Sequence, residues 1–242
     1  MIGWLEQTEA ELPVGDDWLG GSEVVRLKTL RFAKRRADWR LGRWTAKRAA
    51  ATYLNLPADP ATLSKLEIRA APSGAPEVFF ENQPAAVIIS ISHRSGIAIC
   101  AVAPLGASLG CDLEVIEPRS NAFLADYFTR EEQGLLAEKP TEERFRLATL
   151  LWSAKESALK ALHTGLRLDT RCVIVQPLGP LDMQNPSLTF RQACGRNHWV
   201  PLRVRHTGGQ TFDGWWQSTE TLLRTVVTAP PTGPPIPMNV AL

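Results

Sequence analysis

A long helical pattern followed by several short strand-like segments occurs twice in this chain, once on each side of about residue 106. The first helical pattern ends before the prolines of NLPADP, which cannot continue a helix, and the second covers residues 123–162. Short runs rich in Ile, Val and Ala follow each of them and are bounded by Gly, Ser or Pro, as strands are. These runs span residues 65–80, 85–93, 97–104 and 108–116, and then 172–178, 187–193, 200–207 and 222–229.

This order of elements predicts an α+β fold made of two halves of similar size, residues 1–105 and 106–229. We expect the runs at 85–93, 97–104 and 108–116 to be adjacent strands of one sheet. No repeat is visible between the sequences of the two halves. The proline-rich tail, residues 230–242, is expected to lie extended or disordered and carries no residue with evident chemistry.

Composition excludes several classes of protein. The chain has 242 residues, 44% of them hydrophobic, which is typical of a soluble globular protein. Its four cysteines form no CxxC pair and its four histidines do not approach them at zinc-site spacing, so we expect a reduced, cytoplasmic protein without disulfides. Three acids among the first eleven residues argue against a signal peptide. Glycine and proline interrupt the uncharged stretch 95–111, so no membrane span is predicted there.

Positive charge is concentrated between Arg26 and Arg48. This segment holds ten basic residues and a single acid, whereas the whole chain has a net charge of only +2. Small and apolar residues recur there at helical spacing, and a cationic stripe shares another face: Arg36, Arg40, Arg43 and Lys47. Such an excess favours a polyanionic partner, which could be nucleic acid, an acidic protein surface or a phosphorylated cofactor.

Three carboxylates are candidates for a metal site. Asp112 and Glu114 alternate along an apolar strand and therefore point to the same face, either at a solvent-exposed edge or around a hard cation such as Mg²⁺. Glu156 would add a third carboxylate if its helix packs across that strand. Lys155 and Lys160 would then neutralise a phosphorylated ligand; the alternative is a solvated helix face with an ordinary Glu156–Lys160 pair.

Ser92 and His93 end one of the predicted strands, where a histidine serves either a structural or a ligand-binding role. The chain has no GxSxG elbow, Walker loop or GxGxxG motif, so serine-hydrolase, P-loop and Rossmann chemistry are unsupported.

Three motifs in fixed order resemble the 4′-phosphopantetheinyl transferases: SISHRSG, then LGCDLEV about 20 residues later, then LWSAKESALKAL about 40 residues after that. The family pattern is a Ser-His strand end, a Gly-x-Asp-x-Glu strand and a Trp/Phe-Ser-x-Lys-Glu-x-x-x-Lys helix. RRADWRLGRWTAKRA is also similar to the family's basic N-terminal helix, so the resemblance covers roughly residues 20–175. It is closest to the long, monomeric type, which implies two pseudo-symmetric halves, each a small, mostly antiparallel sheet packed with a long helix.

The resemblance implies transfer of the 4′-phosphopantetheine arm of coenzyme A to a serine of an acyl or peptidyl carrier protein, with release of adenosine 3′,5′-bisphosphate. This is the holo-acyl-carrier-protein synthase reaction, and it serves fatty acid, polyketide or nonribosomal peptide synthesis. Neither nucleic acid nor a membrane is an expected partner.

The same resemblance assigns roles to individual residues. The Mg²⁺ ligands would be Asp112, Glu114 and Glu156. The coenzyme A contacts would be Arg43, Lys47, Ser92, His93, Lys155 and Lys160. Mg²⁺ and Lys155 would neutralise the charge of the leaving phosphate. Either Glu132 or a metal-bound water would accept the serine proton. Glu132 also follows a helix start, where acids are favoured for structural reasons alone.

Two departures and two rival functions accompany this assignment. Many relatives have Gly-Lys-Pro where this chain has Gly74, Ala75 and Pro76, so one cationic contact to the 3′-phosphate is missing, and Arg69 is a possible substitute. Cys111 replaces a commoner β-branched residue and is read as neutral. The rivals are a nucleic-acid-binding module on the basic segment, which leaves the three carboxylates without a purpose, and an inactive relative of the family.

Overall fold

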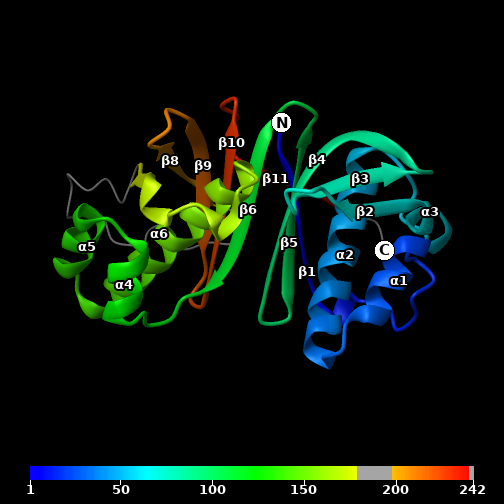
Figure 1. Cartoon of the computed structure of the whole chain (residues 1–242), viewed down its shortest axis with the longest axis horizontal. Helices are drawn as coiled ribbons and strands as arrows, with labels where there is room; N and C mark the ends of the chain where they lie inside the picture. The colour runs from blue at the N-terminus through cyan, green and yellow to red at the C-terminus, as the bar shows by residue number, and fades with distance from the viewer. Residues whose placement is uncertain (179–197, 240–242) are drawn as a thin grey trace. The chain divides into compact units, whose positions relative to one another are not determined.

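The computed structural model describes residues 1–178 and 198–239, which form two compact units (Figure 1). The first comprises Met1–Leu109 and Pro235–Leu242, and the second comprises Gly110–Pro234. The strand predicted at 187–193 lies outside the described residues.

The first unit is a six-stranded sheet in the order β11-β1-β5-β4-β3-β2. All of its described pairings are antiparallel except that of β11 with β1. Its strands are β1 (Gly3–Thr8), β2 (Leu66–Ala70), β3 (Pro76–Phe80), β4 (Gln83–Arg94), β5 (Ile97–Pro104) and β11 (Ile236–Pro237). Its helices are η1 (Glu9–Glu11), α1 (Gly21–Thr29), α2 (Ala33–Tyr53) and α3 (Pro60–Lys65).

The second unit is a five-stranded sheet in the order β6-β10-β9-β8-β7. Its strands are β6 (Ser108–Val115), β7 (Val173–Pro177), β8 (Val200–His206), β9 (Thr211–Ser218) and β10 (Leu222–Ala229). Its helices are α4 (Asn121–Tyr127), α5 (Arg130–Ala137), α6 (Thr141–Ala161), η2 (Gly165–Arg167) and η3 (Thr170–Cys172).

The two units share one topology. In the described residues, each begins with a strand, continues through three α-helices and then has four strands that pair in succession, the last of which lies beside the first strand of the unit. The first unit adds β11 after these. Each also has a 21-residue helix, α2 in the first unit and α6 in the second. The predicted α+β class with two halves of similar fold is therefore confirmed.

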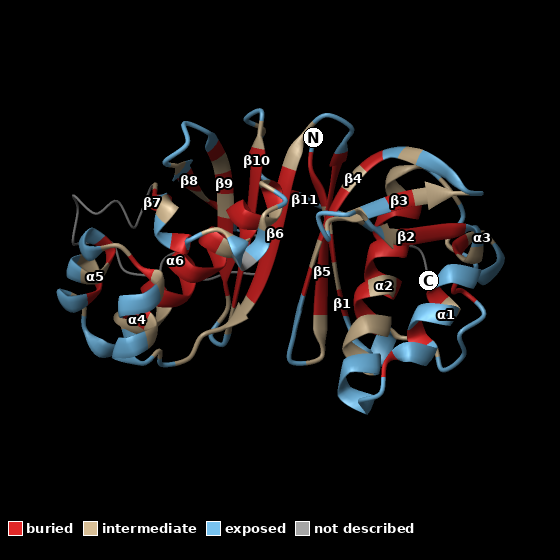
Figure 2. Ribbon diagram, viewed as in Figure 1, coloured by how far each residue is buried: buried red, intermediate tan, exposed pale blue. Residues whose placement is uncertain are grey.

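Each long helix packs on its own sheet, α2 on β5, β4 and β1, and α6 mainly on β10 and β7. The predicted apolar stripe of α6 is buried as expected, from Leu147 to Ala161, and Ala46, Ala49 and Ala50 of α2 are likewise inaccessible to solvent. Figure 2 shows both helices red along much of their length, which marks where the two cores lie.

The structure corrects four expectations about the elements. The 108–116 run, expected beside β4 and β5, forms β6 in the other sheet. Strands β1 and β9 were not predicted. Part of the tail is extended, which was one of the two expectations, but its pairing was not predicted: Ile236 and Pro237 pair with Gly3 and Trp4 of β1. The predicted cationic stripe is also not exposed along its whole length: Arg36 is exposed, but Arg43 is largely covered and Lys47 is fully buried.

Candidate functional site

Glycine at position 110 lets strand β6 lie directly against helix α6. A Cβ atom added to Gly110 would lie 1.8 Å from the carbonyl oxygen of Ser157 and 2.9 Å from the amide nitrogen of Ala161. Only glycine fits such an approach of strand backbone to helix backbone. The contact places Glu156 of α6 near the part of β6 that carries Asp112 and Glu114, which is the packing on which the predicted third carboxylate depends.

Asp112 is held by Lys160, one turn beyond Glu156 on α6. The Lys160 ammonium donates to Oδ1 of Asp112 and to the carbonyl oxygen of Cys111, both at 2.9 Å. Asp112 is only 5% exposed, so its negative charge is compensated inside the protein and not by water. Burial, the largest single effect, would lower the pKa of Lys160, but the interactions with Asp112, Cys111 and Glu156 together outweigh it and the pKa is raised.

Glu114 is held by two other donors. The indole Nε1 of Trp152 donates to its Oε1 at 3.0 Å, and Arg119 donates to its Oε2 at 3.2 Å. Arg119 also pairs with Glu117 and lies over the ring of Phe123. The Glu114 side chain is therefore fixed on both of its oxygens.

The carboxyl group of Glu156 has a strongly raised pKa. Burial, followed by repulsion from Asp112 and from Glu114, raises the pKa of Glu156 from 4.5 to about 7, against the opposing attraction of Lys160. Asp112 and Glu114 are therefore both near enough to act on Glu156.

The chemistry of this donor set fits a hard divalent cation. All three groups offer carboxylate oxygens, which Mg²⁺ prefers, and a cation would relieve the repulsion that raises the pKa of Glu156. Within residues 1–178 and 198–239, no three His, Cys, Asp or Glu side chains are already gathered at metal-binding distance. Lys160 forms an ion pair with Asp112, and Arg119 forms one with Glu114.

Lys155 and Glu132 point into the core of their unit. Their side chains are 0% and 3% exposed, and Nζ lies 2.9 Å from Oε2. Lys155 also donates to the carbonyl oxygens of Thr170 and Val173. The sequence predicted a phosphate contact for Lys155 and a proton acceptor in Glu132, whereas here each faces the other.

The expected coenzyme A contacts of the first unit lie on α2 and β4. His93 is exposed and Ser92 is largely buried near the end of β4. A Cβ atom added to Gly42 would lie 3.7 Å from Cδ2 of His93, so α2 passes close to this histidine. Arg43, the next residue, lies over the Trp39 ring with its Nε 3.8 Å from Glu23. Burial lowers the pKa of Arg43, against the attraction of Glu23.

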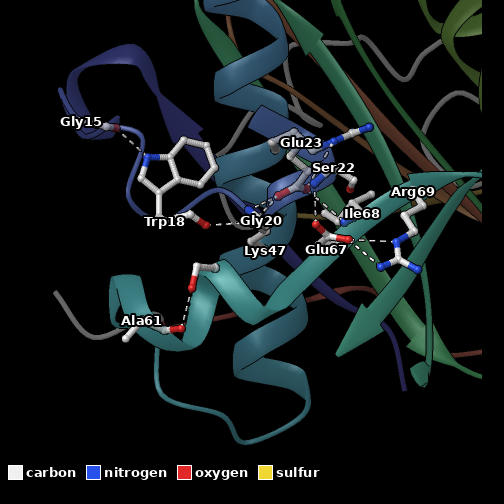
Figure 3. A network of polar contacts seen from close by, with 12 residues as sticks. Gly15, Trp18, Gly20, Ser22, Glu23, Lys47, Ala61, Glu67, Ile68 and Arg69 are labelled. Carbon is white, nitrogen blue, oxygen red and sulfur yellow. Dashed lines mark hydrogen bonds and ion pairs between the residues drawn. The ribbon is translucent and has the colours of Figure 1, made fainter. Parts of the chain in front are cut away.

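Arg69, considered as a substitute for the lysine missing at Ala75, has other partners. Its guanidinium donates to Oε2 of Glu67 through two nitrogens (Figure 3). It also donates to Oδ1 of Asn82. Arg69 is thus tied to its own strand and to a nearby turn.

Sequence reasoning missed Trp152 and Arg119 as donors to Glu114. The signal for Trp152 was available, because it lies four residues before Glu156 and so projects from the same side of the helix. Arg119 follows β6 in a loop, and no periodic pattern predicts where such a side chain points.

A comparison with protein families identifies the segment that holds this site. Residues 108–199, less than half of the chain, match the family model described as the 4′-phosphopantetheinyl transferase superfamily. This segment is a 4′-phosphopantetheinyl transferase superfamily domain. The resemblance read from the three motifs is confirmed at the level of the superfamily, while the long, two-half type stays a prediction.

Comparisons with individual proteins add little. No curated protein matches the chain. Among solved structures, it is similar to Helicobacter pylori holo-[acyl-carrier-protein] synthase in complex with coenzyme A, with 24% identity, a TM-score of 0.34, and coverage of 43% of this chain and 99% of that one. In residues 1–178 and 198–239, none of the helices has the length and apolar character needed to cross a membrane.

Proposed function

We propose that the protein transfers the 4′-phosphopantetheine arm of coenzyme A to a serine of a carrier protein in a Mg²⁺-dependent reaction. One observation carries the proposal. Lys160 of α6 pairs with Asp112 of β6, and the charges of Asp112, Glu114 and Lys160 all act on Glu156. Carboxylates beside a cation suit a metal-diphosphate ligand.

In this reaction the serine hydroxyl oxygen forms a bond to the phosphorus that carries pantetheine. The bond from that phosphorus to the oxygen bridging the diphosphate breaks, and adenosine 3′,5′-bisphosphate leaves with the bond's electron pair. The serine proton passes to a base or to solvent. When bound by Asp112, Glu114 and Glu156, Mg²⁺ would supply positive charge to the diphosphate oxygens.

The chain's own residues bind and orient the substrate. Lys160 is placed to contact the diphosphate, because its ammonium already lies among the carboxylates that would hold the metal. In the first unit we assign phosphate contacts to Arg43 and His93, on the strength of the family motifs. Little covalent chemistry is needed from the protein, so positioning and charge neutralisation supply most of the rate.

The test is the intact mass of an apo carrier protein incubated with the full-length chain, coenzyme A and Mg²⁺. A gain of about 340 Da that disappears with EDTA is expected for a metal-dependent transfer. No gain across acyl and peptidyl carriers, although coenzyme A binds, would favour the inactive relative. Binding of single-stranded DNA without coenzyme A binding would favour the nucleic-acid module.

Metal binding has a test that does not depend on turnover. Mg²⁺ that binds only the folded protein should raise the melting temperature in a concentration-dependent way. Asp112→Asn and Glu156→Gln remove one carboxylate charge each and should abolish this shift. A wild-type shift retained in both variants would exclude these residues as ligands.

A further inference from the structure

Each unit contains a lysine at the same place in its long helix. Lys47 is the fifteenth residue of α2, and Lys155 is the fifteenth residue of α6. Both side chains are fully buried. Burial lowers the pKa of each, and the attraction of one nearby glutamate opposes that effect: Glu23 for Lys47 and Glu132 for Lys155.

The two glutamates are also equivalent. Glu23 is the third residue of α1 and Glu132 is the third residue of α5, and each accepts the backbone N–H of the residue preceding its helix, at 3.0 and 2.9 Å. The second oxygen of each accepts a backbone N–H from the third residue of an edge strand. The donor is Ile68 of β2 for Glu23, at 3.0 Å, and Val175 of β7 for Glu132, at 3.5 Å.

The lysines complete the same arrangement in both units. Lys47 pairs with Glu23 and donates to the carbonyl oxygen of Trp18, over whose ring it lies at 5.5 Å (Figure 3). Lys155 pairs with Glu132 and lies 5.8 Å from the centre of the Phe128 ring. In each unit the pair joins a short helix, an edge strand and the long helix.

Matching α2 to α6 position by position shows a short sequence repeat that the sequence pattern alone did not reveal. Trp44-Thr45-Ala46-Lys47 and Trp152-Ser153-Ala154-Lys155 occupy equivalent turns of the two helices. The next position differs in charge, because it is Arg48 in the first unit and Glu156 in the second. The first unit thus keeps the buried Glu–Lys pair without the third carboxylate of the metal site.

The contacts of Lys155 leave no donor for a ligand. An ammonium has three N–H groups, and those of Lys155 have three partners inside the unit: Glu132 and the carbonyl oxygens of Thr170 and Val173. Glu132 accepts from Lys155 and from two backbone amides, and its side chain is only 3% exposed. Its oxygens are therefore occupied inside the unit and are not open to the serine hydroxyl of a carrier protein.

We propose that Glu132 and Lys155 are a positioning pair and take no part in proton transfer or phosphate binding. The pair fixes the register of α6 and thereby holds Glu156, the next residue, against Asp112 on β6. The inference rests on the proposed function, because it takes Glu156 to be a metal ligand. The buried pair itself does not depend on that function, since both units contain it.

The experiment compares Glu132→Gln with its structural counterpart Glu23→Gln in the full-length protein. Each variant leaves a buried lysine without its carboxylate, so each should lower the melting temperature by a similar amount, about 10 °C. The double variants Glu132→Gln/Lys155→Met and Glu23→Gln/Lys47→Met remove both charges and should regain at least half of that loss.

Mg²⁺ affinity shows whether the Glu132–Lys155 pair positions the metal ligand or only stabilises the fold. It is measured from the Mg²⁺-dependent shift in melting temperature. Glu132→Gln should weaken Mg²⁺ binding about tenfold, the effect expected of a residue that orients a ligand, while Glu23→Gln should leave it unchanged. Equal Mg²⁺ affinity in both variants would overturn the positioning role.

Proton transfer is tested by the pH–rate profile below the melting temperature. We expect kcat of Glu132→Gln to fall less than about tenfold with the acidic limb of the profile retained. Loss of about 100-fold or more together with that limb, not recovered in the double variant, would identify Glu132 as the base and overturn the proposal. If the wild type transfers nothing, the proposed function fails, whereas the melting and Mg²⁺ measurements still decide the role of the pair.

Discussion

The Lys160 ammonium lies 2.9 Å from Oδ1 of Asp112 and at the same distance from the carbonyl oxygen of Cys111. The helix that carries Lys160 also carries Glu156, whose pKa Lys160 lowers and Asp112 raises. One lysine thus compensates the charge of one carboxylate and tunes another, before any ligand is bound.

Replacing Lys160 with methionine should destabilise the protein at pH 7.5, by about 3 kcal/mol, because Asp112 would be left buried without its cation. The pKa of Glu156 should rise further, so the loss should be smaller at pH 5, where Glu156 is protonated. Lys160→Arg keeps the charge and serves as the control. Urea unfolding of both variants at the two pH values measures the effect; equal losses at both would contradict the coupling.

Glu156 should make stability depend on pH. Its folded pKa of about 7 exceeds the value of 4.5 expected in the unfolded chain. Its contribution to stability is therefore fully present below about pH 4.5 and is lost as the pH rises through 7. In EDTA, Glu156→Gln should flatten the decline in the free energy of unfolding across this range. Parallel curves for wild type and variant would show that the pKa of Glu156 is not raised.

Trp152→Phe should weaken metal binding with little change in packing. Phenylalanine retains an aromatic ring near Phe123 and Tyr127, whose ring centres lie 5.0 Å from that of Trp152, but it loses the hydrogen bond to Glu114. We expect Mg²⁺ affinity to fall about tenfold and the free energy of unfolding by about 1 kcal/mol. The Mg²⁺-dependent melting shift checks this, and an unchanged affinity would remove Trp152 from the site.

Gly110→Ala should be among the most damaging single substitutions in the second unit. The added Cβ meets backbone atoms of Ser157 and Ala161, which cannot move without displacing α6 from β6. A loss of about 3 kcal/mol is expected. Gly134→Ala is the matched control, because nothing lies within 4 Å of its Cβ position in α5, and it should stabilise by about 0.5 to 1 kcal/mol. Chemical denaturation distinguishes the two, and equal effects would refute the close approach.

Thr225→Val should loosen the contact between α6 and β10. The Thr225 hydroxyl lies 2.9 Å from Oγ of Ser153 and 2.7 Å from Oγ of Ser157, and all three residues are buried. Valine has a similar shape but leaves both serines without this partner, which should cost about 1 to 3 kcal/mol. Thr225→Ser keeps the hydroxyl and should cost less; the reverse order would show that the methyl group matters more.

Local pattern was sufficient to predict much of the fold and the types of residue in the site. Helical spacing predicted the second long helix and its apolar stripe, and alternation placed Asp112 and Glu114 on one face of a strand. These features depend on residues close together in the chain. β1 was missed because Glu6 and Gln7 interrupt its apolar character, and β9 because Asp213 and Gly214 do.

The sequence by itself determined which charged groups the protein has and where they lie along each helix and strand. Only the tertiary structure decided what each of them faces. Lys155 and Lys160 both lie on α6, yet Lys155 meets Glu132 in the core while Lys160 meets Asp112 on β6. Glu132 and Asp112 come from segments 23 and 48 residues away in the chain. Helical periodicity sets the direction of a side chain around its own axis, whereas the partner found in that direction depends on how distant elements pack.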